Sequence, residues 1–164
     1  MVDDFPEDKE RLAHLARLAA RSFTRSLQFR LDGFDMTFGH WVFLRILWDE
    51  DGLTQRVLSE RANLTEPTTH NALVKLEILG YIKRKNLKGN KRKQHAFLTK
   101  KGSDARIMLE PLAVEVNEVA IHGISDEDVA TFRKTLLVVI ENLTKDETRE
   151  LSQGKRVPPT RGAR

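Results

Sequence analysis

The sequence predicts a mainly α-helical fold with one small β-hairpin. Apolar residues recur at helical spacing along most of the chain, and Ser or Thr stands at the expected start of several helices. Between residues 81 and 99, two short strand-like runs flank a segment containing a Gly-Asn pair, which is typical of a hairpin turn. A length of 164 residues suits one compact subunit and is short for a multidomain enzyme.

Composition excludes several classes of protein. The chain is 40% hydrophobic and 32% charged, and its apolar runs are interrupted well before membrane-spanning length. Its opening residues, MVDDFPEDKE, are acidic and polar, unlike a secretory signal, so we expect a cytoplasmic protein without membrane association. The absence of cysteine excludes disulfides, thiolate metal sites and a cysteine-based peroxide sensor. Because the five histidines are scattered, we expect no metal site and no cofactor.

Two helices are expected in the first third of the chain. The first covers roughly residues 8–30, with apolar positions at Leu12, Leu15, Ala16, Ala19, Phe23 and Leu27. Thr37 then stands where it can cap a second helix, which is apolar almost all round from Trp41 to Trp48 and is interrupted by Arg45. We therefore expect the second helix to be buried on most sides.

A pair of helices joined by a tight turn follows. Thr54 caps a short helix that reaches about Ala62, and Thr65 caps the next one, which ends at Gly80. Its expected inward stripe is Thr69, Ala72, Leu73, Leu76 and Leu79. Its outward residues, mostly types that form hydrogen bonds, are Glu66, Thr68, His70, Asn71 and Lys75.

A hairpin and two further helices complete the pattern. The strands are expected at residues 81–85 and 94–99. A helix then runs from Lys100 to near Gly123, with Ala105, Leu109, Leu112, Val116 and Val119 on one face. Ser125 caps a last amphipathic helix whose apolar face is Val129, Phe132, Leu136, Ile140 and Leu143. The polar stretch from about Thr144 is expected to be disordered.

Positive charge is concentrated in residues 83–101, here called the basic segment. It contains nine Lys or Arg and no Asp or Glu. Because this segment supplies +9 and the whole chain carries +4, the rest of the chain carries −5. A local cluster of cations suits a surface that displaces counterions from a polyphosphate backbone. The sequence therefore predicts a DNA-binding module.

The order helix, turn, helix and basic hairpin is that of a winged helix-turn-helix, in which the second helix enters the major groove and the hairpin approaches the minor groove. The stretch GLTQRVLSERANLTEPTTHNALVKLEILGYIKRKNLKGNKRKQHAFLTKKG, residues 52–102, resembles the MarR family of transcriptional regulators. The resemblance extends more weakly to Met36-Thr37, to residues 41–47 and to the two closing helices. It implies a homodimer that binds a palindromic DNA operator, usually as a repressor released by a small ligand.

The resemblance also implies a domain organisation. Residues 1–35 would form a leader and a dimerisation helix, residues 36–100 the winged DNA-binding domain, residues 101–145 the C-terminal dimerisation helices, and residues 146–164 a flexible tail. Leu76 and Gly80-Tyr81-Ile82 would form the junction from helix to strand, and Leu98-Thr99 and Gly102 match the start of the following helix.

Residue by residue, the resemblance implies a phosphate-contacting cap at Thr54, a recognition helix over residues 65–75 and a wing tip at Arg92. The family usually has Asp two residues before the wing arginine, whereas this chain has Asn90, which can hydrogen-bond to Arg92 but cannot ion-pair with it. The expected DNA-binding residues are Thr54, Thr65, Thr68, His70, Asn71, Lys75, Lys88, Asn90, Lys91, Arg92 and Lys93.

A ligand site is a further hypothesis. Aromatic residues on the first two helices suit core packing, yet they also suit a flat pocket for an aromatic acid or its CoA thioester, whose anionic end nearby basic residues would hold. Arg45 fits either that role or an ion pair with a nearby acid. The candidate residues are His14, Arg17, Phe23, Phe38, His40, Trp41 and Arg45.

Three other functions are consistent with parts of the pattern. An effectorless architectural or nucleoid protein would bind DNA with little sequence preference and a steep salt dependence. A winged-helix adaptor that binds other proteins would not need the basic segment. An enzyme is disfavoured because the chain has no Gly-rich phosphate loop, no nucleophile elbow and no His-Glu zinc helix.

Overall fold

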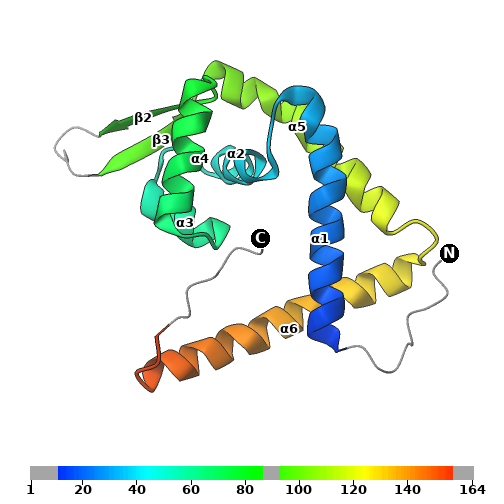
Figure 1. Cartoon of the computed structure of the whole chain (residues 1–164). Helices are drawn as coiled ribbons and strands as arrows, with labels where there is room; N and C mark the ends of the chain where they lie inside the picture. The colour runs from blue at the N-terminus through cyan, green and yellow to red at the C-terminus, as the bar shows by residue number, and fades with distance from the viewer. Residues whose placement is uncertain (1–10, 87–92, 157–164) are drawn as a thin grey trace. The chain divides into compact units, whose positions relative to one another are not determined.

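The structure is a computed structural model and describes residues 11–86 and 93–156 (Figure 1). The chain forms two compact units, Met1–Ala120 and Ile121–Arg164. The first contains α1 (Leu12–Leu31), a short 3-10 helix η1 (Asp32–Phe34), α2 (Phe38–Asp49), β1 (Leu53–Thr54), α3 (Gln55–Ala62), α4 (Glu66–Ile78), β2 (Ile82–Asn86), β3 (Gln94–Leu98) and α5 (Lys100–Ala120). The second contains α6 (Asp126–Ser152). The predicted fold class, mainly helical with a small β wing, is confirmed.

Hydroxyl side chains begin the helices where the sequence places them. The Thr37 Oγ1 accepts a hydrogen bond from the backbone N–H of His40 (3.2 Å) and caps α2. Thr54 caps α3 and Thr65 caps α4 in the same way. Each cap satisfies a backbone N–H that has no partner inside its helix. The three predicted helix starts are confirmed.

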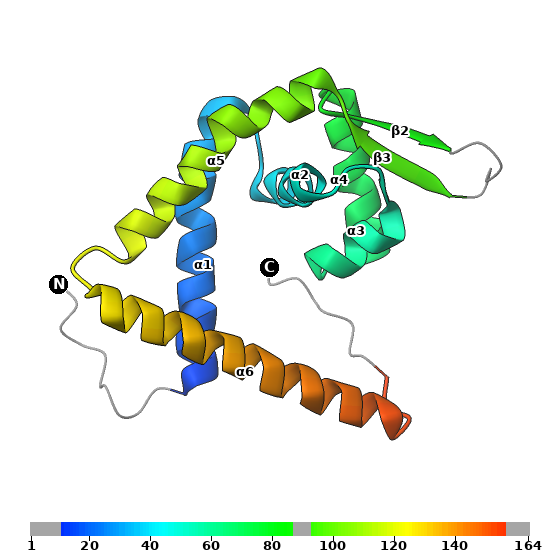
Figure 2. The same ribbon diagram turned by 180° about the vertical axis from the view of Figure 1, so that it is seen from behind.

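The helix α2 is the centre of the first unit. Phe43, Leu44 and Leu47 are at most 1% exposed, as the apolar run predicted. In Figures 1 and 2, α2 lies between α1 on one side and α3 and α4 on the other. The buried residues that pack around it include Leu31, Leu58, Leu73, Leu76 and Leu109. The helix-turn-helix is therefore built on a rigid core.

The small sheet has three antiparallel strands in the order β1-β3-β2. β2 and β3 form the predicted hairpin, with Ile82 opposite Leu98. The third strand, β1, was not predicted; its Leu53 pairs with Ala96. Two residues are too few to show an alternating pattern, so the pairing is visible only in three dimensions. It connects the start of α3 to the wing, by which we mean β2, β3 and the residues between them.

The junction between the wing and α5 is closely packed. Thr99 donates its hydroxyl to the Gly80 carbonyl (2.6 Å), and the same Oγ1 accepts from the backbone N–H of Gly102 (3.1 Å). The Gly102 carbonyl in turn accepts from the Trp48 indole N–H (2.9 Å). Gly102 thus joins the start of α5 to α2 and, through Thr99, to the residue Gly80 before β2.

The helix α5 ends close to the predicted position. It stops at Ala120, and Gly123 in the following turn has a left-handed backbone (φ 80°). On the predicted apolar face, Leu109 and Val116 are buried, whereas Val119 is 59% exposed. The expected start of α1 near residue 8 lies outside the described residues.

The helix α6 is longer than the sequence predicted. It begins at the Ser125 cap, as expected, but the polar stretch after Thr144 remains helical to Ser152. Side-chain pairs one turn apart, such as Glu141 with Lys145, stabilise a helix without an apolar stripe. The expectation of disorder from Thr144 onward is wrong as far as Ser152. None of the helices in the described part of the chain is long and apolar enough to cross a membrane.

Candidate nucleic-acid interface

The turn between α3 and α4 sets the direction of α4. Asn63 adopts a left-handed conformation (φ 52°), and the N–H of Leu64 donates to the Ser59 carbonyl (3.0 Å). On α4, Thr69, Leu73 and Leu76 are buried against the core, as predicted. The opposite side of the helix is consequently exposed to solvent.

The predicted DNA-contacting residues of α4 are all exposed: Thr65, Thr68, His70, Asn71 and Lys75. At about 100° per residue, Asn71 lies almost opposite the buried stripe. His70 lies on one flank of that exposed face, and Thr68 and Lys75 lie on the other. The helix therefore presents a broad polar surface of the kind that enters a major groove.

A contact that the sequence did not predict links α3 to α4. The Oε1 of Gln55 is 3.1 Å from the Nδ1 of His70. Gln55 is the first residue of α3, directly after the Thr54 cap, and no local pattern marks it. The pair lies at a groove whose lining residues are Thr54, Gln55, Arg56, Glu66, Asn86, Lys93 and Gln94. This groove brings the start of α3, the start of α4 and both strands of the wing together.

Four of the nine cations of the basic segment have partners within the chain. Arg84 forms an ion pair with Glu77, and Lys100 forms one with Asp104. The Lys85 ammonium lies 4.4 Å from the centre of the Phe97 ring. Lys101 donates to the Leu79 carbonyl (2.8 Å). A count of charges in the sequence therefore overestimates the number of cations that are available to phosphate.

Two of the remaining cations are in the described residues, Lys83 near the start of β2 and Lys93 directly before β3, and the other three lie outside them. Lys83 and Lys93 are exposed. Four of the predicted DNA-binding residues lie outside the described residues: Lys88, Asn90, Lys91 and Arg92. Thr54, the predicted phosphate contact, is half-buried, and its Oγ1 accepts from the Val57 N–H (3.3 Å) as a helix cap.

Glu77 and Arg84 fix the end of α4 to the wing. One oxygen of the Glu77 carboxylate accepts from the Arg84 backbone N–H (2.8 Å), and the other accepts from its guanidinium Nε (2.9 Å). The backbone N–H bond is the largest cause that holds the pKa of Glu77 below its ordinary value, and the Arg84 side chain adds to it. The carboxylate thus sets the angle of the wing relative to the recognition helix.

Replacing Glu77 by glutamine should lower the free energy of unfolding near neutral pH by about 1–2 kcal/mol, because a charge-assisted bond is lost. Since the pKa of Glu77 is lower in the folded chain than its ordinary 4.5, this stabilisation is present above pH 4.5 and is lost as the pH falls through the folded value. Urea unfolding of both proteins should therefore show a difference that shrinks in acid. Glu60→Gln removes the exposed pair with Arg56 and should change little; a constant difference for Glu77→Gln at all pH values would contradict the prediction.

The proposed ligand residues fall into two groups. On α2, the Phe38 and Trp41 ring centres are 5.9 Å apart, and the Arg45 guanidinium lies 5.5 Å from the centre of the Trp41 ring. His40 is buried beside them, and its Nδ1 accepts from the Thr37 N–H (3.4 Å). Burial, and secondly the charge of Lys75, lowers the pKa of His40. In the described part of the chain Arg45 forms no ion pair with an acid, and its guanidinium lies over the Trp41 ring instead.

The second group lies on α1 and is separate from the first. It consists of His14, Arg17 and Phe23. The end of α1 packs near α2 through Leu27 and Leu31, and a rise of 1.5 Å per residue places His14 roughly 20 Å before Leu27 along the axis. Within the described chain, therefore, the structure does not bring His14 and Arg17 to the aromatic residues of α2.

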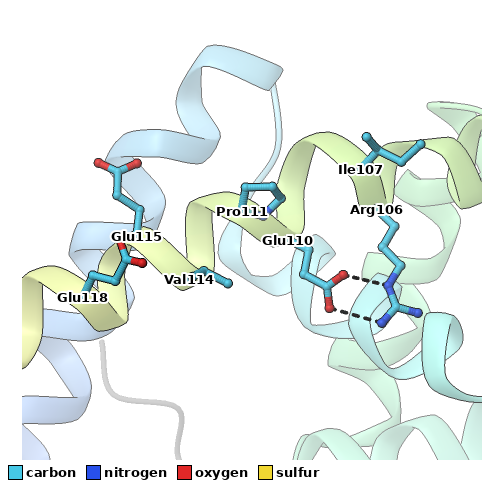
Figure 3. A pocket seen from close by; sticks show the side chains of 7 residues that line it. All are labelled: Arg106, Ile107, Glu110, Pro111, Val114, Glu115 and Glu118. Carbon is cyan, nitrogen blue, oxygen red and sulfur yellow. Dashed lines mark hydrogen bonds and ion pairs between the residues drawn. The ribbon is translucent and has the colours of Figure 1, made fainter. Parts of the chain in front are cut away.

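A shallow pocket that the sequence did not predict lies along α5 (Figure 3). Its lining residues are Arg106, Ile107, Glu110, Pro111, Val114, Glu115 and Glu118. Figure 3 shows both oxygens of Glu110 bonded to the Arg106 guanidinium, at 2.8 and 3.1 Å, and this bond lowers the pKa of Glu110. Glu115 pairs with Arg30 of α1 (2.9 Å). Two of the four charged groups in this pocket are therefore already paired with each other, and a third with α1.

A capped recognition helix, a tight turn and a basic wing, all packed on α2, define a winged helix-turn-helix DNA-binding protein. Residues 36–93 match the sequence model of the MarR family. A MarR transcriptional regulator from Methanosarcina mazei Go1 superposes with a TM-score of 0.77 at 26% identity, over 84% of this chain and 92% of that one. Over this domain the chain resembles the MarR family, and it is a DNA-binding transcriptional regulator.

Further comparisons agree with this assignment. The HTH-type transcriptional regulator YybA of Bacillus subtilis, whose function is not characterised, is 26% identical over 129 residues, which are 79% of this chain and 86% of that protein. A putative MarR family regulator from Listeria monocytogenes, solved with a 26mer DNA, has the same fold: the TM-score is 0.78 at 21% identity, over 91% of this chain and 99% of that one. The family resemblance inferred from residues 52–102 is thus confirmed.

Proposed function

We propose that this regulator is a sequence-specific repressor that binds a palindromic operator as a homodimer and is released by a small ligand. The observation that carries the proposal is the exposed polar face of α4, with Asn71 at its centre and the cations of the wing beside it. Hydrogen-bonding side chains on such a face can read base edges, and the wing cations add affinity for phosphate. The Listeria relative solved with DNA supports the same mode of binding.

Exposed apolar side chains support the homodimer. Leu12 of α1 is 80% exposed and Met108 of α5 is 58% exposed. On α6 the expected apolar face is exposed at Phe132, Leu136, Ile140 and Leu143. Surfaces of this kind are usually covered in solution, and helices from a second copy of the chain are the cover that we propose. Two copies then present two recognition helices to two half-sites.

Ligand release would act through the spacing of the recognition helices. Both half-sites are engaged only when the two helices lie about one helical turn of DNA, roughly 10 bp, apart. A ligand that prefers a different spacing would lower operator affinity by the ratio of its affinities for the two shapes. We propose an aromatic acid or its CoA thioester, held by Phe38 and Trp41 with Arg45 at the anionic end, because the Trp41 ring already lies near both Phe38 and Arg45.

Fluorescence anisotropy with DNA from upstream of the regulator's own gene tests the DNA-binding part of the proposal. At physiological salt, we expect binding about 10³-fold or more tighter than to scrambled DNA. Arg92→Ala and Lys93→Ala should weaken binding to both DNAs, and each should reduce the salt slope by about 1. Lys100→Ala, whose ammonium is already paired with Asp104, is the matched control and should change little.

Two results would contradict the proposal. Equal affinity for operator and scrambled DNA would indicate an architectural protein, and no binding to either would favour a protein-binding adaptor. The ligand part is tested separately, by titrating the operator complex with benzoate and benzoyl-CoA. Operator affinity that stays constant for every compound that measurably binds the protein would contradict ligand release.

A further inference from the structure

In the contact between Gln55 and His70, the imidazole donates the hydrogen bond and the amide oxygen accepts it. The Gln55 atom that faces the ring is Oε1, at 3.1 Å from Nδ1 of His70. An amide oxygen can only accept a hydrogen bond, so Nδ1 must be the ring nitrogen that carries the proton. In a neutral imidazole the other nitrogen, Nε2, is then an acceptor. Gln55 thereby determines which hydrogen-bonding group His70 presents on its far side.

Gln55 is well placed to hold this arrangement. It is the first residue of α3, directly after the Thr54 cap, and it is half-buried. Its backbone carbonyl accepts from the hydroxyl of the buried Ser59 (2.9 Å). Thr54 also pairs with His95 of β3, which further fixes the backbone just before Gln55. The amide is thus attached to a restrained segment of chain.

His70 is in the part of α4 that most often contacts bases. It is exposed and is the fifth residue of α4, and the N-terminal residues of a recognition helix commonly reach base edges. In the major groove, adenine N6 and cytosine N4 are amino groups that donate hydrogen bonds. Guanine O6 and N7 and thymine O4 are acceptors. An acceptor on the protein therefore pairs with adenine or cytosine and repels guanine and thymine.

We propose that Gln55 is a specificity-determining residue: it holds His70 as the Nδ1–H tautomer, so that Nε2 accepts from the exocyclic amino group of adenine or cytosine in the operator. The inference rests on the proposed sequence-specific binding and names one base preference within it. Gln55 acts through His70, so it positions the reading side chain without touching the base.

The tautomer can be measured without DNA. Long-range ¹H–¹⁵N correlation spectra distinguish the two neutral tautomers, and His70→Gln identifies the His70 signals by their loss. In the wild-type protein we expect the Nδ1–H form to predominate for His70. In Gln55→Ala the Nε2–H form of His70 should gain population, because the Nδ1–H form no longer has the hydrogen bond to the Gln55 amide oxygen. A predominant Nε2–H form in the wild-type protein would overturn the inference.

Base preference is measured on an operator selected from random DNA. Each base pair is then varied, and the position whose discrimination disappears in His70→Ala is the one that His70 reads. We expect about fivefold or greater discrimination among the four base pairs there, directed at the amino group on the adenine or cytosine of the preferred pair. Replacing that base by an analogue without the exocyclic amino group (purine for adenine, 2-pyrimidinone for cytosine) should cause a similar loss in the wild-type protein.

Variants of Gln55 separate positioning from direct contact. Gln55→Ala should reduce discrimination at the same base pair, and combining it with His70→Ala should cause no further loss. Gln55→Glu keeps an acceptor for Nδ1–H, so the base preference should survive while affinity for all DNA falls through repulsion of phosphate. Arg56→Ala, next along α3, is the control: its guanidinium is paired with Glu60, and its loss should leave the base preference unchanged.

The outcomes distinguish this inference from the proposed function. Full affinity for an operator in which the base pair read by His70 lacks its exocyclic amino group would overturn the inference and leave sequence-specific binding intact. Retention of the base preference in Gln55→Ala would do the same. If no position of any DNA is discriminated, the proposed function and the inference are both overturned.

Discussion

Replacing Gly102 by alanine is expected to lower the free energy of unfolding by about 2–4 kcal/mol, the largest stability loss predicted for a single methyl group in this chain. A Cβ at this position would lie 2.0 Å from the Tyr81 carbonyl oxygen, which is backbone and cannot rotate away. That oxygen also accepts from the backbone N–H of Thr99 (3.0 Å). Any shift that admits the methyl group must disturb the junction between the wing and α5. Urea unfolding at a fixed protein concentration measures the loss.

Gly39→Ala is a matched control in the same unit. Gly39 lies in α2, and its new Cβ would be no closer than 3.8 Å to the nearest heavy atom, Thr37 Oγ1. Because alanine is the better helix former, this change should be neutral or stabilising by up to about 1 kcal/mol. Equal stability of Gly102→Ala and the wild-type protein would show that the wing moves freely relative to α5. In that case the wing would not be held at a fixed angle to the recognition helix.

Local signals were sufficient to predict most of the fold. Thr37, Thr54 and Thr65 act as caps because the side chain bonds within its own first turn, so sequence neighbours decide the outcome. The apolar run of α2 implied burial regardless of what covers it. Family resemblance over residues 52–102 then supplied the arrangement that periodicity alone could not.

Features that depend on distant pairing were missed. β1 is visible only because Leu53 and Ala96 come together across the hairpin. The Gln55 and His70 pair joins two helices through side chains fifteen positions apart. Arg84 counted as a free cation in the sequence, yet Glu77 accepts both its backbone and its side-chain N–H. Contacts of this kind follow from how the helices pack, which no short sequence window contains.

For the same reason, the sequence predicted the DNA-binding part of the candidate site better than the ligand-binding part. The exposed residues of α4 followed from one helix and its buried stripe, a local pattern. The ligand residues required two helices to be placed relative to each other. The structure brings Trp41 together with Phe38 and with Arg45, and it leaves His14 about 20 Å along α1 before Leu27, the first buried residue of that helix.

Replacing Asn71 by alanine is expected to weaken binding to the operator by about 1–3 kcal/mol, roughly 5- to 150-fold, and to relax selection at one base pair. Asn71 is exposed opposite the buried face of α4, and an asparagine amide can bond both N6 and N7 of adenine. Because no core contact is lost, the free energy of unfolding should change by less than about 0.5 kcal/mol. Anisotropy titrations with operator and scrambled DNA measure the binding.

Binding to scrambled DNA and its salt slope should be unaffected by Asn71→Ala, because the residue carries no charge. Asn117→Ala is the matched control: it removes the same side chain from α5, where the amide donates to the Ala113 carbonyl (2.7 Å), far along the chain from the α3–α4 surface. This control should bind the operator like the wild-type protein. An equal loss of affinity for operator and scrambled DNA would mean that Asn71 contacts phosphate. Unchanged affinity for both DNAs would mean that the centre of α4 does not contact the bases. A loss confined to one adenine position would place that centre in the major groove, since only there does adenine present N6 and N7 together.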